Sequence, residues 1–177
     1  MSVEFKAWPK IPRGNGEGIV ITEKLDGTNA CVIVENDQVI GIQSRKRLIT
    51  PEDDNYGFAR WVRDNEEELV KLGDGYHYGE WVGLGIQGNP HCLHEKQFHL
   101  FNSGRWSNPE TRPVCCHCVK VLFTGQSTPE NIDLTLEDLW EDALGEYVPE
   151  GIVVFFQRSQ RLEKHTFKYS QGKWRDE

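Results

Sequence analysis

Four consecutive residues, Lys24-Leu25-Asp26-Gly27, combine a potential nucleophile, a carboxylate and a turn former. A lysine amine attacks an electrophile only after losing its proton, so a nucleophilic lysine needs surroundings that lower its pKa. Burial and neighbouring positive charge both act in that direction. An ordinary surface turn has the same composition, so the meaning of this tetrapeptide depends on the residues farther along the chain.

Further groups capable of chemistry occur in a definite order. They are the basic run Arg45-Lys46-Arg47, the carboxylate Glu80, the aromatic segment from Phe98 to Phe101, the carboxylate Glu150 before Gly151, and the C-terminal Lys164 and Lys168. This order resembles that of the covalent nucleotidyltransferases, the superfamily of ATP-dependent DNA and RNA ligases and capping guanylyltransferases. The resemblance extends from about residue 19 to 168. Asn29, two places after Gly27, makes the chain most similar to the RNA-ligase branch, in a minimal form of phage or bacterial type.

The resemblance implies a role for each charged group near the reacting phosphate. Lys24 would attack the α-phosphate of ATP and hold AMP as a phosphoramidate. Lys164 and Lys168 would bind the α-phosphate and stabilise its developing charge. Glu150 would help to organise Mg²⁺ or Mn²⁺, hard ions that prefer oxygen ligands.

The resemblance also assigns residues to the rest of the nucleotide and to the later steps. Glu80 would accept a hydrogen bond from the ribose, and Phe98 would lie against the adenine, with Phe101 as the second candidate. Glu23 would read the exocyclic amine, and Arg45 would contact the ribose or a phosphate. Asp26, in a catalytic role, and Asn29, beside the cofactor, would orient the RNA terminus.

Hydrophobic patterning predicts an α+β protein with antiparallel sheets and few helices. Strands are expected at 18–23, 29–34, 38–43, 76–82, 97–102, 115–123, 150–157 and 162–169. Helices are expected at 56–72 and from Thr135 to Leu144. Asp26-Gly27 between two strand-like runs favours a hairpin. The resemblance adds a ligase-type, ATP-grasp-like arrangement, with the nucleotide in a cleft between two sheets.

Composition places limits on the class of protein. The chain has 177 residues, 37% hydrophobic and 11% aromatic, typical of a globular protein. We expect one domain over residues 1–177 with no C-terminal OB-fold. We also expect no membrane-spanning run and no signal peptide. Five cysteines, three of them crowded at 115–118, favour a reducing, cytoplasmic location over a disulfide framework.

The net charge of −8 argues against a protein that coats nucleic acid indiscriminately. Its positive residues are nevertheless clustered at 45–47 and 158–175, and its acids at 52–54, 66–68 and 130–146. Such segregation permits a local phosphate-binding groove on an acidic body. We therefore expect Arg45, Lys46 and Arg47, with the C-terminal cluster, to bind RNA locally and weakly.

Two alternatives remain open at this stage. Zinc is a possible ligand of the cysteines and histidines at 91–94 and 115–118, although their spacing differs from that of common zinc sites. The predicted activity is that of an ATP-dependent RNA ligase, which joins a 5′-phosphate to a 3′-hydroxyl through a lysyl-AMP intermediate. A DNA ligase or capping enzyme core, or a non-catalytic nucleotide- or RNA-binding module, is the alternative.

Overall fold

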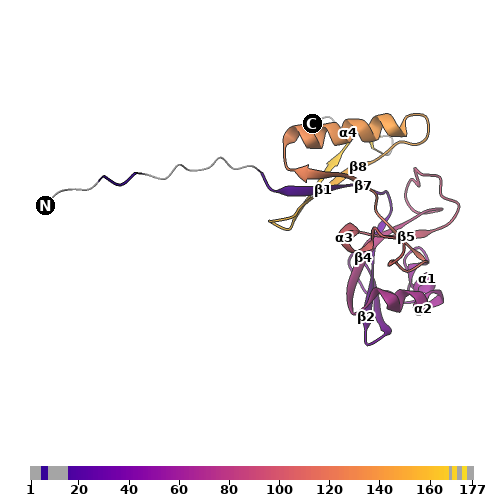
Figure 1. Ribbon diagram of the computed structural model, residues 1–177. Coiled ribbons are helices and arrows are strands. Elements are labelled where there is room, and N and C mark those ends of the chain that lie inside the picture. The colour runs from indigo at the N-terminus through magenta and orange to yellow at the C-terminus, as the bar shows by residue number, and fades with distance from the viewer. Residues whose placement is uncertain (1–4, 8–15, 168, 171–172, 175–177) are drawn as a thin grey trace.

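Two β-sheets carry the fold in the computed structural model, which describes residues 5–7, 16–167, 169–170 and 173–174 (Figure 1). The first, here called the β1 sheet, has the order β7-β1-β8-β9 and is antiparallel throughout. Its strands are β7 (Val121–Gln126), β1 (Gly18–Glu23), β8 (Gly151–Phe156) and β9 (Arg161–Thr166). A short pair, β10 (Tyr169–Ser170) and β11 (Lys173–Trp174), comes next along the chain.

The second sheet, here called the β2 sheet, has the order β3-β2-β4-β5-β6. Its strands are β3 (Gln38–Ser44), β2 (Thr28–Glu35), β4 (Gly75–Val82), β5 (Gln97–Leu100) and β6 (Cys116–Cys118). All neighbours are antiparallel except β5 and β6. The predicted α+β class with two mostly antiparallel sheets is therefore confirmed.

The predicted hairpin at Asp26-Gly27 is wrong. β1 pairs with β7 and β8, whereas β2 pairs with β3 and β4, so residues 24–27 cross from one sheet to the other. Turn chemistry is local, but each of these strands pairs with partners that arrive later in the chain. The predicted strand 115–123 is likewise divided between β6 of the β2 sheet and β7 of the β1 sheet, so the chain crosses between the sheets a second time. Glu23 N, beside the first crossing, donates to Lys120 O in the second at 3.1 Å.

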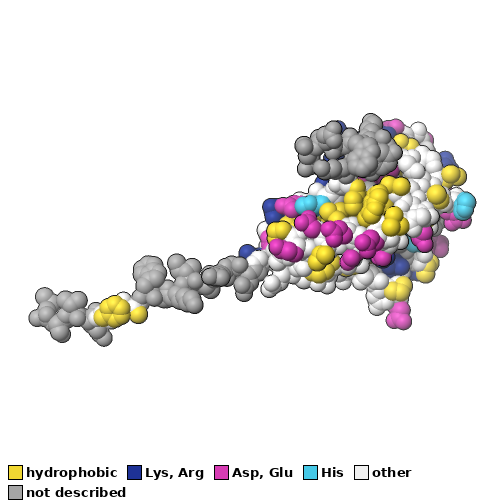
Figure 2. Space-filling model, turned by 90° about the horizontal axis from the view of Figure 1, so that it is seen from above, with side chains coloured by type: hydrophobic (Ala, Val, Ile, Leu, Met, Phe, Trp, Pro, Cys, Tyr) yellow, Lys and Arg dark blue, Asp and Glu magenta, His cyan; other side chains and the backbone are white. Residues whose placement is uncertain are grey.

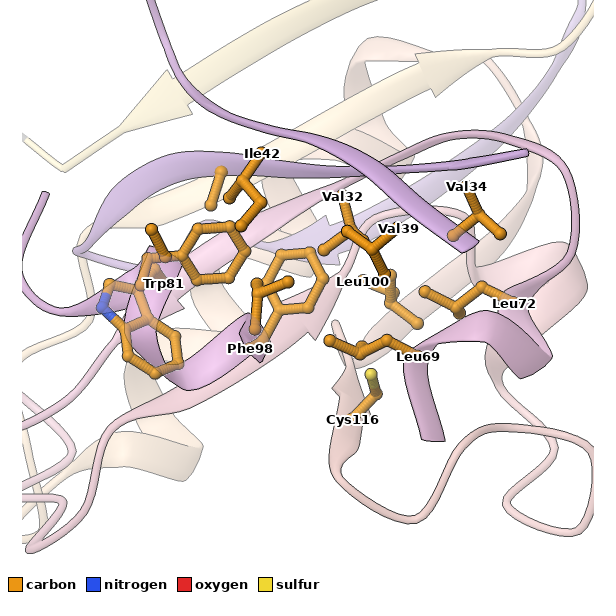
Figure 3. Close-up of a cluster of buried hydrophobic side chains, with 14 of the residues drawn as sticks. Val32, Val34, Val39, Ile42, Leu69, Leu72, Trp81, Phe98, Leu100 and Cys116 are labelled. Atoms are coloured by element: carbon orange, nitrogen blue, oxygen red, sulfur yellow. The ribbon is translucent and has the colours of Figure 1, made fainter. Parts of the chain in front are cut away.

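The β2 sheet has its core on one face, beneath three short helices (Figure 3). They are α1 (Phe58–Asp64), α2 (Glu66–Leu69) and η1 (Val70–Leu72). The pattern predicted one helix over 56–72, but the structure breaks it at Asn65, whose side chain donates to Trp61 O at 2.7 Å. Asn65 has φ −117° and ψ 18°, outside the helical region, so the first helix ends there and a new one begins.

The β1 sheet is covered by α4 (Pro129–Ala143), on the face away from the β2 sheet (Figure 1). Leu139 packs there against Ile21 and Val154. The helix begins six residues before the predicted start, because Thr128 accepts from Asn131 N at 3.1 Å and caps it. Thr135 lies inside the helix and donates to Asn131 O at 2.6 Å.

The acidic segment predicted at 130–146 falls largely on this helix. Seen from the α4 side, the molecule shows acidic side chains beside hydrophobic ones (Figure 2). Among the described residues, no helix is both long and apolar enough to cross a membrane.

Close packing at the crossing generates a stability prediction. A Cβ at Gly27 would lie 2.3 Å from Trp81 O and 2.6 Å from Val82 Cγ1, which no relaxation of one flexible side chain would relieve. Gly27→Ala should therefore lower the free energy of unfolding by about 1–3 kcal/mol, as overpacking commonly does. Urea denaturation measures this. Gly104→Ala is the matched control, because its nearest neighbouring atom would lie 3.6 Å away; equal losses in the two variants would contradict the packing argument.

Candidate active site

Lys24 lies at the end of β1, where the chain leaves the β1 sheet. Its backbone N donates to Gly151 O at 2.9 Å, and its Nζ lies 2.5 Å from Glu150 Oε1. Gly151 has φ +149°, and a Cβ there would lie 2.1 Å from His165 O, so only glycine fits beside β9. Two predicted motifs, whose charged residues are 126 positions apart in sequence, thus meet through a main-chain and a side-chain contact.

Glu80 brings a second carboxylate to this point from the β2 sheet. Its Oε2 accepts from Asn29 Nδ2 at 2.9 Å, since the two residues pair across β2 and β4. Burial raises the pKa of Glu80 to about 7 against the opposing attraction of Lys24, and the negative charge of Glu150 raises it further. Lys24, Glu80 and Glu150 therefore form one electrostatic cluster at the seam between the sheets.

Glu150 has a free acceptor for a cation. Its Oε2 is buried and has no hydrogen-bond partner, while Oε1 is taken by Lys24. An orphaned carboxylate oxygen fits a divalent ion, which keeps several waters and shares phosphate oxygens as ligands. Within the described part of the chain, no group of three or more His, Cys, Asp and Glu side chains is arranged to hold a metal.

A cavity of about 240 Å³ adjoins the cluster. Its walls come from the ends of β1, β4 and β6, the crossing, the segment between β4 and β5, β5 itself, and the link from β6 to β7. The lining residues are Glu23, Leu25, Asp26, Val82, Asn89, Pro90, His91, Leu93, Gln97, His99, Cys118 and Lys120. Asp26 accepts from Gly88 N at 3.0 Å and so ties the crossing to the loop that closes the cavity. The cavity is lined by rings, aliphatic groups and a few polar atoms, a mixture that is typical of a small-molecule site.

The sequence was compared with models of known protein families. The model of the RNA ligase family matches residues 17–170. The chain belongs to the RNA ligase family. A search of curated proteins finds none that match it.

Solved structures of the Naegleria gruberi RNA ligase share the fold. A ligand-free mutant of the Naegleria gruberi RNA ligase superposes with a TM-score of 0.64 at 22% identity, over 86% of this chain and 50% of that one. A second mutant, with ATP and Mn, gives 0.63 at 20% identity over 86% and 49%. A third, with AMP and Mn, gives 0.63 at 19% identity over 86% and 50%. The present chain therefore spans about half the length of these structures.

The structure corrects the RNA ligase site predicted from sequence at Phe98. This ring is fully buried, packs against Phe58 at 5.0 Å between centroids, and lies on the helix-covered face of the β2 sheet (Figure 3). It cannot lie against a base. His99 is the ring of β5 that faces the cavity, and it pairs with Glu80 in register. Burial, and then His117 stacked on it at 4.9 Å, lower the pKa of His99 to about 4, so the ring is neutral near pH 7.

The predicted basic residues fall into different settings. Arg45 and Lys46 are exposed directly after β3, whose Ser44 pairs with Ala30 beside the site. Arg47 instead binds its own loop, with Nη1 2.8 Å from Asp53 Oδ2. Lys164 is exposed and pairs with Val153 across β8 and β9. Val153 lies two residues after Gly151, whose carbonyl accepts the hydrogen bond from Lys24 N.

The structure describes only some of the other basic residues predicted near the C-terminus. Lys168 lies outside the described residues, as do the side chains that come after it. Arg161 is paired with Glu163 at 2.9 Å and covers the Phe156 ring.

Two residues of the site were missed by sequence reasoning. Tyr147 and His91 both contact Oε1 of Glu23 at 2.9 Å. Both lie in irregular segments with no periodicity to signal them. His91 was considered only as a zinc ligand, because its neighbours in sequence are cysteine and histidine.

The raised pKa of Glu80 predicts a pH-dependent stability. A carboxyl whose pKa rises on folding stabilises the folded state at low pH, and this contribution is lost as pH rises from about 4.5 through about 7. Glu80→Gln should therefore raise the melting temperature at pH 8 and leave it nearly unchanged at pH 4.5. The gain in the free energy of unfolding at pH 8 should be roughly 1–3 kcal/mol. Calorimetry at both pH values measures it. Glu35→Gln, exposed on the same sheet, should show no such pH dependence, and an equal effect in both variants would refute the assignment.

Proposed function

We propose that this chain is the nucleotidyltransferase domain of an ATP-dependent RNA ligase. The observation that carries the proposal is the convergence of Lys24, Glu150 and Glu80 at one seam beside a cavity. The family match and the ATP- and Mn-bound structures of the Naegleria enzyme support it. ATP and Mg²⁺ or Mn²⁺ are accordingly the proposed cofactors, and RNA with 5′-phosphate and 3′-hydroxyl ends is the proposed substrate.

The first step takes place at Lys24. Its ammonium group first releases one proton to solvent. The neutral amine then attacks the α-phosphorus of ATP, the bond to the bridging oxygen breaks, and pyrophosphate leaves. The amine loses its remaining extra proton to solvent and keeps AMP as a phosphoramidate. The 2.5 Å contact to Glu150 fixes Nζ in the crossing, next in sequence to the cavity-lining Leu25 and Asp26, and Asn29 orients Glu80 for the ribose.

Two further displacements complete the reaction. A 5′-phosphate oxygen attacks the phosphorus of Lys24-AMP and frees the amine, which gives an adenylylated RNA end. A 3′-hydroxyl then attacks the 5′-phosphate, loses its proton and expels AMP. Glu150, through its unpartnered Oε2, would hold a divalent ion, which would offset the phosphate charge. Asp26, in the crossing, and Asn29, near the start of β2, are the residues proposed to orient the RNA terminus.

Covalent self-labelling tests the proposal. After incubation with ATP and Mg²⁺, the intact mass of the protein should increase by one adenylyl group, and Lys24→Ala should abolish the increase. Lys71→Ala is the matched control, because Lys71 is paired with Glu68 on the helix side of the β2 sheet. A non-catalytic binding module would hold ATP without gaining mass. A Lys24→Ala protein that still gains the mass would place the nucleophile elsewhere.

The exposed cations beside the site predict how RNA is bound. Arg45→Gln with Lys46→Gln should slow the sealing of 5′-phosphorylated RNA and leave Lys24-AMP formation intact. The dependence of log affinity on log salt should become shallower by roughly 1–2, since each phosphate contact to a single strand contributes about 0.7. Fluorescence anisotropy of labelled RNA at several salt concentrations measures the slope.

The matched control for this prediction carries the same loss of charge elsewhere. Arg60→Gln with Lys71→Gln removes two cations from the helices on the opposite face of the β2 sheet. If both pairs of substitutions change the slope equally, RNA affinity depends on net charge and not on a groove beside Arg45. Arg47 is excluded from the pair, because it also donates to the backbone carbonyls of Asp53 and Asp54 and so holds its own loop. Lys71, by contrast, is paired with the Glu68 side chain.

A further inference from the structure

One carboxylate in the site is held by rings from both parts of the fold. Glu23, the last residue of β1, is 6% exposed. Its Oε1 accepts from Tyr147 Oη at 2.9 Å and lies 2.9 Å from His91 Nε2. Tyr147 lies between α4 and β8, and His91 lies in the segment between β4 and β5. The two donors therefore reach the same oxygen from elements that belong to different sheets.

The two rings also support each other. Their centroids are 4.0 Å apart and their planes are inclined by 37°. Burial, and then the hydrogen bond to Glu23, raise the pKa of Tyr147, so its hydroxyl keeps the proton that it donates. A carboxylate with two donors on one oxygen has lost most of its rotational freedom before any ligand binds.

Glu23 is held at the wall of the cavity and not within a sealed core. Glu23 and His91 both line it, with His99 as a neutral ring in the same wall. An ionised carboxylate only accepts hydrogen bonds. It therefore attracts a ligand N–H and repels a ligand oxygen at the same place, which is the difference between the 6-amino group of adenine and the 6-oxo group of guanine.

We propose that Tyr147 and His91 are positioning residues that fix the Glu23 carboxylate to select purines with a 6-amino group. The inference rests on the proposed function for its choice of ligand, a purine nucleoside triphosphate. A buried hydrogen-bonding group discriminates strongly only if it cannot turn away from the wrong ligand, because a mobile carboxylate would find another partner or water. Two fixed donors on Oε1 prevent that movement.

Equilibrium binding tests the inference without requiring catalysis. The dissociation constants of ATP and of purine riboside triphosphate, which lacks only the 6-amino group, are compared in the full chain by calorimetry. The native protein should prefer ATP by about 10–100-fold, the value of one hydrogen bond to a charged group. Tyr147→Phe keeps the ring and removes the donor, and should reduce this ratio about tenfold by weakening ATP alone. Tyr76→Phe, 60% exposed on β4, is the matched control.

The outcomes separate this inference from a merely structural role and from the proposed function. A native ratio near one, or a Tyr147→Phe protein that binds both nucleotides more weakly by the same factor, would overturn the inference. If Tyr147→Phe fails to fold, His91→Phe provides the same comparison, because it removes the second donor. Self-labelling with ATP is scored separately, so a protein that binds selectively and never gains mass would refute the ligase and leave the selectivity standing.

Discussion

The site depends on the passage of the chain from one sheet to the other within residues 24–27. Both ends of this crossing are fixed, by the 2.9 Å hydrogen bond from Lys24 N to Gly151 O and by the contact of Gly27 with the Trp81 carbonyl. Glu150 lies directly before β8 of the β1 sheet, and Glu80 lies in β4 of the β2 sheet. The nucleophile proposed at this seam therefore receives a carboxylate from each sheet.

The charges at the seam do not balance. Lys24 is the cation between Glu80 and Glu150, and its attraction does not keep the pKa of Glu80 at its ordinary value, because burial outweighs it. The unpartnered Oε2 of Glu150 is the second sign of this imbalance. Adding a triphosphate would increase the negative charge, so the site as built requires further cations, from a divalent ion and from basic side chains, before it can hold ATP.

The sequence indicated which charged residues meet at this seam better than it indicated how the strands around them pair. Lys24, Glu80 and Glu150 were identified from motif order, and the structure brings them together. The hairpin failed because Asp26-Gly27 satisfies turn chemistry without revealing which strands pair. The placement of Phe98 against the adenine was wrong because it chose the wrong face of β5. The alternation of side chains in this four-residue strand shows that it has two faces. Which face meets the cavity depends on the helices that cover the other one, and these come from a different part of the chain. Tyr147 and His91 lie in loops, where no pattern relates them to Glu23.

The net charge of −8 does not describe the surroundings of the seam, for a geometric reason. The acids of α4 lie on the face of the β1 sheet away from the β2 sheet, so a layer of protein separates them from the seam (Figures 1 and 2). Exposed charges more than about 8–10 Å away are largely screened at physiological salt. The potential that a phosphate would meet at the seam therefore depends mainly on the nearby charges of Lys24, Glu80 and Glu150, with the exposed Arg45 and Lys46 after β3, and much less on the sum over the chain. An acidic protein can hold a polyanion if its acids are placed behind a sheet and its few cations in front of it.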